Sequence, residues 1–291
     1  MNKEFYTRRK FLLNTGLSAG SLILPGAMRA ATQPFQKKQM RFRLIRHATL
    51  LLDTGKYSLL VDPMLSAKEA MDPVGNAANS YRIPMTDLPF GDKELQKLLS
   101  ATDAVLITHT HRDHWDAAAQ QLIAKDKKIF CQPADEEKIR KQGFTDVTPV
   151  QDQLTWNGIT IFRTGGRHGT GEIGKLMGTV SGFVVKQEEQ SVYIAGDTIW
   201  CSEVEEAINQ YQPAHIIVNG GGARFLTGDP ITMTRNDVAA VADFTKATIT
   251  VVHLDTVNHC LEKRIDFRNF VQEKGIVKKI NIPDDGDWLM I

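Results

Sequence analysis

Short apolar runs with the character of β-strands dominate the chain from residue 40 onward. Residues 41–53 and 56–64 form two such runs, separated by the hairpin signal Thr54-Gly55. Residues 104–107 are apolar throughout and partly β-branched, as in a buried strand of a sheet that is covered on both faces. Similar runs predict a strand at 128–131, β-rich sequence from residue 146, a hairpin within 181–198, and strands that begin at residues 215 and 249.

Helical patterns alternate with these strands. They predict helices at 92–99, at 117–122 with Asp116 as N-cap, at 135–141, at 202–211 and after an N-cap at Thr234. Residues 66–91 are different, because prolines and glycines interrupt them and no periodicity is present. They predict a long loop, and loops of this length often act as lids or binding loops.

The most distinctive polar cluster, H-x-H-x-D-H, follows the strand at 104–107. It consists of His109, His111, Asp113 and His114, on a predicted loop at 108–115 between that strand and the next helix. Imidazole and carboxylate groups suit Zn, Mn or Fe better than metals that prefer thiolates. Four such groups within six residues exceed what one tetrahedral ion could accept from so short a loop, so the cluster indicates two metal ions.

This motif after an apolar strand resembles the metallo-β-lactamase superfamily. The resemblance implies an α/β fold, an αββα four-layer sandwich with the metal site at the edge between the two sheets. It also implies further ligands downstream, each placed after a strand. His168 in a glycine-rich loop, Asp197 within Gly196-Asp197-Thr198, and His253 at the end of the strand from 249 match them in order.

The same resemblance distributes the ligands. It implies one metal held by His109, His111 and His168, another held by Asp113, His114 and His253, and Asp197 as a bridge. Two divalent ions are expected, zinc first and manganese or iron as alternatives. Asp113 or Asp197 would orient a metal-bridged hydroxide or move its proton. Asp62, at the end of the strand in 56–64, would support the metal loop through hydrogen bonds.

Other histidines receive structural interpretations. His47 lies inside the apolar run 41–53 and is interpreted as a core or face residue. His215 and His259 are also interpreted as structural, with His259 expected near the site. Gly220-Gly221-Gly222 could bring backbone amides near an anion, but no lysine of a phosphate-binding loop accompanies these glycines.

Composition narrows the class of protein. With 291 residues, 42% of them hydrophobic, the chain can bury a full core. A formal charge of +1 gives no basic field that would indicate nucleic acid as a partner. The superfamily resemblance implies a small-molecule substrate. The cysteines Cys131, Cys201 and Cys260 are too widely spaced for a disulfide framework or a zinc knuckle. They are interpreted as buried thiols, and a pairing of two of them stays open.

The first thirty residues predict a signal segment. Arg8, Arg9 and Lys10 precede an uncharged stretch from residue 11 to residue 28, and T-R-R-K-F-L resembles the twin-arginine signal of bacterial export. Glycine and proline interrupt this stretch, so no stable membrane span is expected. The predicted organisation is a signal at 1–30, a linker at 31–40 and a catalytic domain at 41–291. The protein would meet the export machinery transiently and reside in the periplasm.

The predicted activity is metal-dependent hydrolysis of a small ester, lactone, amide or phosphodiester. Within the superfamily, the segments RHATLLLD, LLVDP, GDT and HLDT look most like the ascorbate-6-phosphate lactonase-like branch. Two alternatives stay open. One is an iron-dependent oxidoreductase similar to a sulfur dioxygenase, and the other is a non-catalytic metal-binding protein on the same fold.

Overall fold

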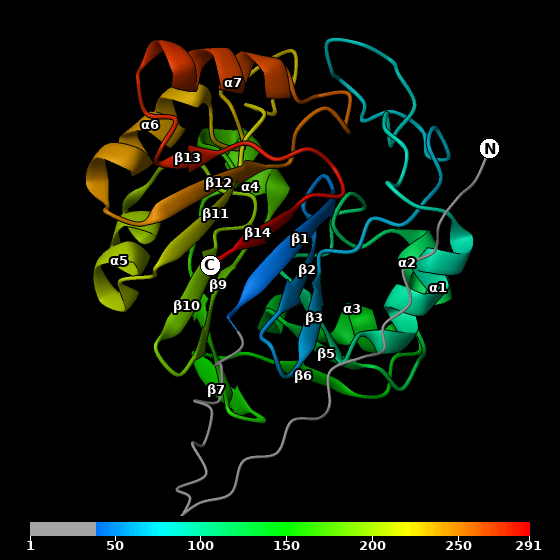
Figure 1. The fold of residues 1–291 in the computed structure, drawn as a ribbon. Helices are drawn as coiled ribbons and strands as arrows, with labels where there is room; N and C mark the ends of the chain where they lie inside the picture. Colours follow the sequence, from blue (N-terminus) through cyan, green and yellow to red (C-terminus); the bar gives the residue numbers. More distant parts are fainter. Residues whose placement is uncertain (1–38) are drawn as a thin grey trace, which may run out of the picture. The chain divides into compact units, whose positions relative to one another are not determined.

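Two mixed β-sheets of seven strands each form the centre of the structure (Figure 1). The structure is a computed structural model and describes residues 39–291. The predicted signal at 1–30 and most of the linker lie outside the described residues. The first sheet has the strand order β14-β1-β2-β3-β4-β5-β6. Its strands are β1 (Arg41–Arg46), β2 (Thr49–Asp53), β3 (Ser58–Val61), β4 (Ala104–Ile107), β5 (Lys128–Cys131), β6 (Val147–Pro149) and β14 (Trp288–Met290).

The second sheet has the order β13-β12-β11-β10-β9-β8-β7. Pairing is antiparallel from β7 to β10 and parallel from β10 to β13, just as the first sheet is antiparallel from β14 to β3 and parallel from β3 to β6. The strands are β7 (Gln153–Trp156), β8 (Ile159–Thr164), β9 (Gly182–Gln187), β10 (Gln190–Ile194), β11 (His215–Asn219), β12 (Thr248–Val252) and β13 (Ile280–Asn281).

Alternation along the strands separates an inner core from two outer cores. In β4, Leu106 joins the cluster between the sheets, while its neighbours Val105 and Ile107 join the cluster beneath the helices. In β11, Ile217 faces inward and Ile216 faces outward in the same way. Because both faces of each sheet are covered, the central strands are apolar throughout, as the run at 104–107 predicted.

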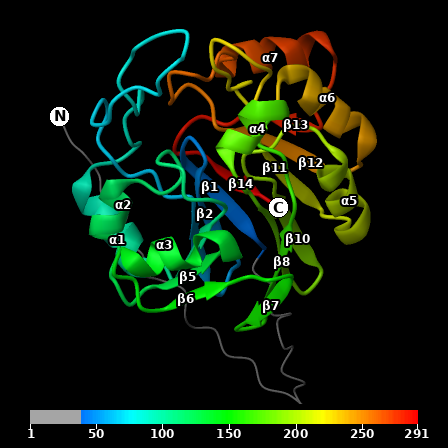
Figure 2. The ribbon, with the colours of Figure 1, turned by 180° about the vertical axis from the view of Figure 1, so that it is seen from behind.

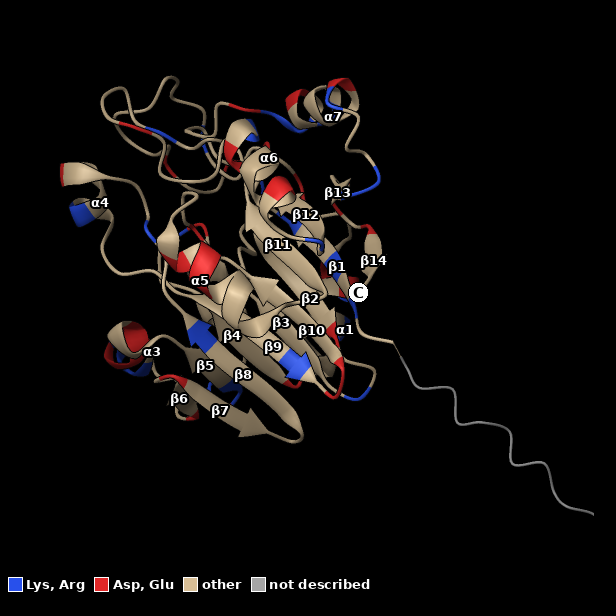
Figure 3. Cartoon of the chain, turned by 90° about the vertical axis from the view of Figure 1, so that its left-hand side faces the viewer, with Lys and Arg blue, Asp and Glu red and all other residues tan. Residues whose placement is uncertain are grey.

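Helices cover the outer face of each sheet and complete the predicted αββα sandwich. The first three pack against the first sheet, and α5, α6 and α7 pack against the second, as the view from behind shows (Figure 2). Most charged residues lie in the helices and loops, while the strands carry few (Figure 3). The helices are α1 (Asp92–Ala101), α2 (Ala117–Leu122), α3 (Glu136–Lys141), α4 (Gly171–Met177), α5 (Ser202–Tyr211), α6 (Arg235–Phe244) and α7 (Arg264–Glu273).

Most predicted elements are present, with one consequential correction. The run 41–53 is not one strand, because the chain turns back at His47 and Ala48 so that Arg46 pairs with Thr49. No glycine, proline or asparagine marks this turn, and His47 itself adopts the left-handed conformation with φ of 60°. The predicted helix at 135–141 begins with a 3₁₀ turn, Pro133–Asp135, ahead of α3. The elements α4, α7, β13 and β14 had no counterpart in the sequence prediction.

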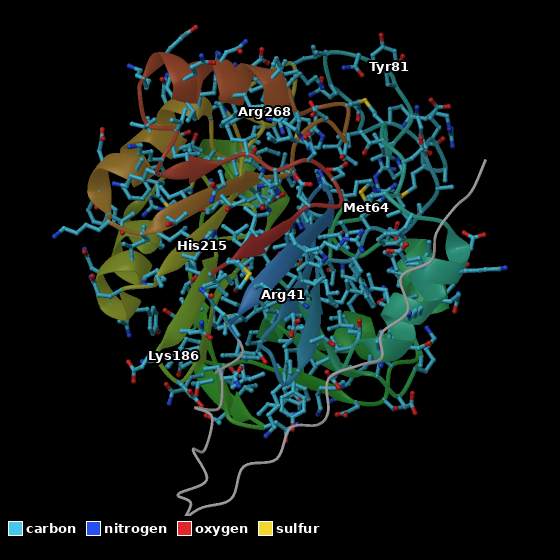
Figure 4. All side chains as sticks on the ribbon, viewed as in Figure 1. Arg41, Met64, Tyr81, Lys186, His215 and Arg268 are labelled. Carbon is cyan, nitrogen blue, oxygen red and sulfur yellow. The ribbon has the colours of Figure 1, made fainter. Side chains whose placement is uncertain are left out.

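The predicted long loop lies between β3 and α1, where an isolated bridge between Met71 and Ile83 is its one element of regular pairing. Its apolar residues pack with those of the loop after β11 and the segment after β12, in a small separate cluster. Tyr81 points outward from this loop, with 68% of its surface exposed (Figure 4). Among the described residues, no helix combines the length and apolar character that crossing a membrane requires.

Candidate metal centre

Strands from both sheets end in one place, and each delivers a polar side chain there. In the first sheet, β3 ends at Asp62 and β4 leads into the loop of the H-x-H-x-D-H motif. In the second sheet, β8, β10 and β12 lead into His168, Asp197 and His253. Most of these side chains are buried, and His111 is partly exposed. The site therefore lies where the two sheets meet, and its side chains stand on strand ends that packing holds in place.

The structure brings the seven residues predicted as metal ligands together in groups. Nitrogens of His109, His111 and His168 lie within 4.8 Å of one another and form the first group. Asp113, His114 and His253 form a second group, which also includes His47. His109 and His114 share a third group with Asp197, which thus lies between the other two.

The carboxylate of Asp197 is central to the arrangement. Its Oδ2 lies 3.1 Å from His114 Nε2, 3.5 Å from His168 Nε2 and 3.8 Å from His109 Nε2. Its Oδ1 lies 3.4 Å from His253 Nε2 and accepts a hydrogen bond of 2.7 Å from the Asn219 amide. One carboxylate therefore faces imidazoles of both groups, as a bridging ligand would.

Hydrogen bonds on the far side of the imidazoles fix which ring nitrogen carries the proton. His114 Nδ1 donates to Asp62 over 2.9 Å, and His168 Nδ1 donates to the carbonyl of Ile231 over 2.8 Å. The Thr108 hydroxyl donates to Asp62, so it can accept from His109 Nδ1, 3.1 Å away. In each case Nε2 is left with its lone pair toward the centre, which is the ligand form of histidine.

These donor atoms fit divalent cations. His114 Nε2 and His253 Nε2 are buried and have no hydrogen-bond partner, although carboxylate oxygens are near. Buried polar atoms without partners are rare in proteins, and a cation would satisfy both lone pairs. Neutral imidazoles beside carboxylates also match the usual ligands of zinc, with manganese and iron as further possibilities.

Electrostatics in the centre favour positive charge between the carboxylates. Burial raises the pKa of Asp113 and Asp197, but the surrounding imidazoles, above all His114, lower it more, so both pKa values lie well below the usual range. Burial lowers the pKa of His253, and the charge of Asp197 then raises it to about 10. The ionised carboxylates thus stabilise nearby positive charge, which protons or divalent cations supply.

Asp62, for which the sequence predicts a supporting role, contacts the metal loop in the structure. Its carboxylate accepts hydrogen bonds of 2.7 Å from both the amide and the hydroxyl of Thr108, and one of 2.9 Å from His114. The residue is 1% exposed and has φ of 44°, which turns the chain directly after β3. Asp62 thereby joins the strand end to the metal loop and orients His114.

His47 is the main residue that the sequence interpretation missed. Its Nε2 lies 3.2 Å from Asp113 Oδ2, and its ring lies against that of His253, with 3.7 Å between centroids and 36° between the ring planes. Burial and the neighbouring His253 lower its pKa to about 3, so the ring is neutral. The interpretation of His47 as a core or face residue assumes one strand over 41–53, whereas the turn at His47 directs its side chain into the centre.

The glycines at 220–222 also have a role that the sequence interpretation missed. Gly221 has φ of 84°, and a Cβ there would lie 2.9 Å from both the Cys260 sulfur and the carbonyl oxygen of His253. Cys260 in turn contacts His253 Nδ1 at 3.4 Å. Gly221 therefore permits the close packing that holds His253.

The structure also answers the question of cysteine pairing. Cys131, Cys201 and Cys260 are all buried free thiols.

The two remaining histidines occupy different environments. His215 lies between the sheets, where its Nε2 is 2.8 Å from the Thr250 hydroxyl, and burial lowers its pKa to about 4 (Figure 4). His259 is 6% exposed and stacks on Phe225, and its Nδ1 is buried without a partner. Burial lowers the pKa of His259 to about 4, with smaller effects from Asp113 and other groups of the centre. His259 thus adjoins the centre, as expected.

Comparisons with known proteins agree with this geometry. A family model described as a β-lactamase superfamily domain matches residues 58–253. UPF0173 protein YddR from Bacillus subtilis is 35% identical over 254 residues, which cover 85% of this chain and 98% of that protein. The chain therefore belongs to the β-lactamase superfamily, within its UPF0173 family of metal-dependent hydrolases.

Two solved structures are also similar along most of the chain. The crystal structure of a possible metal-dependent hydrolase from Veillonella parvula is 36% identical, with a TM-score of 0.83, and covers 87% of this chain and 100% of that one. The isothiocyanate hydrolase from Delia radicum gut bacteria is 38% identical, with a TM-score of 0.82, and covers 87% of this chain and 99% of that one. The protein is thus a metal-dependent hydrolase whose substrate the fold leaves open.

Proposed function

We propose that this protein holds two divalent metal ions and uses them to hydrolyse a small electrophile, with isothiocyanates as the first substrates to test. The observation that carries the proposal is the donor set: two groups of ligand atoms, with Asp197 in contact with members of both. The ligand chemistry supports zinc, with manganese or iron as alternatives. The similarity to an isothiocyanate hydrolase supports the choice of substrate.

Each side chain has a definite task in this proposal. When bound, the ions supply a hydroxide nucleophile at neutral pH and polarise the electrophile. The carboxylates of Asp113 and Asp197 face the imidazoles of the centre, so either would orient the attacking water or take up its proton. The ion positions would be held by His109, His111 and His168 on one side, by Asp113, His114 and His253 on the other, and by Asp197 as the bridge.

For an isothiocyanate the products follow from this chemistry. The water oxygen adds to the central carbon while the carboxylate takes one of its two protons. That proton and the proton left on the added oxygen both move to the nitrogen, and the carbon–nitrogen bond breaks. One isothiocyanate and one water thereby give one amine and one carbonyl sulfide. The carboxylate returns to its ionised form, so no other reactant is consumed.

Apolar side chains beside the centre support a substrate with an apolar group. The separate cluster of the long loop includes Ile231, whose carbonyl binds His168, and Cys260, which contacts His253. Partly buried residues packed on it include Met71, Met85, Met177, Ile173 and Phe225. Methionine side chains adapt to varied apolar shapes. A groove of about 800 Å³ between α1 and the β2–β3 hairpin has no lining residue from the centre, so we do not place the substrate there.

Other small electrophiles belong in the same test. The sequence resemblance to ascorbate-6-phosphate lactonase-like hydrolases supports lactones, and a pair of metal ions also suits esters, amides and phosphodiesters. The panel should contain one uncharged and one anionic member of each class, together with an aryl-alkyl isothiocyanate. A preference for uncharged substrates is expected from the apolar cluster beside the centre.

The first experiment is metal analysis of the purified protein by elemental mass spectrometry, in wild type and in Asp197→Ala. About two zinc or manganese ions per chain, with fewer in the variant, are expected. Amine release from the isothiocyanate should follow metal content when the ions are removed and returned. One iron per chain would favour the oxidoreductase alternative, and no metal after reconstitution would contradict the proposal.

We also propose that the protein is exported to the periplasm by the twin-arginine route. Arg8 and Arg9, which precede the uncharged stretch, support this. Cell fractionation of the full chain should find it in the periplasm, and an R8K/R9K double variant should stay in the cytoplasm. Equal distribution of the two forms would contradict the proposal.

A further inference from the structure

We propose that His47 is a fourth protein ligand of the metal position formed by Asp113, His114 and His253, which makes the two metal positions unequal. The inference rests on the proposed occupancy by two ions. It adds a residue from the turn between β1 and β2, outside the histidine and aspartate pattern recognised in the sequence.

The distances suit a shared ion. For ligand atoms about 2.1 Å from a tetrahedral zinc ion, neighbouring ligand atoms lie about 3.4 Å apart. Asp113 Oδ2 lies 3.2 Å from His47 Nε2, 3.6 Å from His253 Nε2 and 3.8 Å from His114 Nε2. All four atoms lie within 4.8 Å of one another. The spacing from His47 to Asp113 therefore matches those of the predicted ligands.

Three imidazole nitrogens converge on one carboxylate oxygen, which hydrogen bonding alone does not explain. The nitrogens of His114 and His253 that face Asp113 have no hydrogen-bond partner. A hydrogen bond from His47 would satisfy one side of Asp113 and would leave both of those atoms unpaired. A cation among the four atoms satisfies all of them together.

The backbone holds His47 in place for this role. Its φ of 60° is strained for a residue with a side chain, and such strain is concentrated at functional sites. The carbonyl of His47 accepts a 2.9 Å hydrogen bond from the amide of His253, and the two rings are in contact, with 3.7 Å between centroids. The ring is 1% exposed and its Nδ1 has no partner. The turn and the contact with the His253 ring therefore orient the His47 ring, a task that a hydrogen bond at the second nitrogen usually performs in metal sites.

Unequal ligand numbers have a testable consequence. With His47, the metal position that includes Asp113 has four protein ligands. The position of His109, His111 and His168 has three. Asp197 would add one ligand to each position. A chelator titration of the wild-type protein should therefore remove the ions in two steps, first from the three-histidine position. Cobalt substitution should give two distinct visible spectra as the positions fill.

The test uses two variants at one position, each measured for metal affinity and for the cobalt spectrum. His47→Gly removes the ring and keeps the positive φ without strain, so the variant should fold. His47→Gln keeps a hydrogen-bond donor that could reach Asp113. Both should weaken the tighter ion at least tenfold, leave the other within twofold, and change the cobalt spectrum of the tighter position. His215→Gln is the control, because His215 is a buried histidine between the sheets.

The outcomes separate this inference from the proposed function. Wild type without metal after reconstitution contradicts the proposed function. Wild type with two ions, together with His47→Gly that retains both at unchanged affinity, overturns only the role of His47. Unchanged affinity and spectrum in His47→Gln, with loss in His47→Gly, would also overturn ligation and would make His47 a positioning residue. Thermal unfolding of each metal-free variant verifies that it is folded.

Discussion

Replacing Asp62 with asparagine tests how the fold prepares His114 to bind a metal ion. The side chain keeps its shape, and its remaining oxygen can still accept from the amide of Thr108. The new NH₂ group then faces His114 Nδ1, which carries a proton in the wild type. Two donors cannot pair, so His114 is driven to the other tautomer, in which Nε2 carries the proton and cannot bind metal. The perturbation thus acts on the metal through a residue that does not touch it.

The magnitude follows from the bonds involved. Loss of a supporting hydrogen bond beside a metal ligand typically lowers metal affinity about 10- to 100-fold, or about 1.4 to 2.8 kcal/mol. The loss of a buried hydrogen bond to a charged group also lowers the free energy of unfolding of the metal-free protein, by about 1.5 to 3 kcal/mol. Competition with a chromophoric chelator measures the first quantity, and urea unfolding without metal measures the second.

Asp116→Asn provides a matched control. Asp116 is also 1% exposed, and its carboxylate accepts 2.7 Å hydrogen bonds from the amides of Ser66 and Ala119. It belongs to none of the groups of candidate ligands in the described residues. The control should lose a similar amount of stability and keep its metal affinity. The reasoning fails if Asp62→Asn binds metal as tightly as the wild type, or if Asp116→Asn loses affinity to the same degree.

Three further predictions concern glycine, histidine protonation and the vicinity of the centre. The Gly221→Ala variant should bind metal more weakly and unfold at lower urea concentration than the Gly158→Ala variant. Both glycines have φ near 84°, but only a Cβ at Gly221 would collide with neighbouring atoms. Equal losses in the two variants would contradict this reasoning. Burial lowers the pKa of His215 to about 4, so the unfolded chain, with a pKa near 6.5, gains the proton first as pH falls. In urea titrations of the metal-free protein, His215 should therefore lower the free energy of unfolding by about 2 kcal/mol between pH 7 and pH 5. The His215→Gln variant should lack this loss. His259→Ala should lower kcat/KM at least tenfold with metal content unchanged, and a parallel loss of metal would show that His259 acts on the structure instead.

The sequence was most informative where chemistry and secondary structure coincide. The metal loop could be predicted because its histidines follow an apolar run, and Asp116 caps the next helix by accepting from Ala119, as expected. His168, Asp197 and His253 could be ordered because each follows a strand in the pattern of a known family. The αββα arrangement came from that resemblance, and the two packed sheets confirm it.

The remainder depends on contacts between residues that are far apart in the chain. His47 could not be recognised, because its turn has no turn-forming residue and its left-handed backbone is held by a hydrogen bond from His253. Cys260 and Asn219 contact site residues only through tertiary packing. The short helix α4 follows a glycine-rich loop, where local propensity is weak, and its side chains are not fully buried.

The pairing of β14 with β1 affects when this protein can fold during synthesis. Arg41 lies opposite Met290 in the sheet, and the amide of Ile291 donates to the carbonyl of Met40. Strand β1 therefore has both its edges paired only after residues 288–290, almost 250 positions further along the chain, have been synthesised. The metal centre likewise needs β12, which leads into His253, so during synthesis the first sheet cannot be complete before residues 288–290 have emerged from the ribosome, nor the metal centre before residue 253.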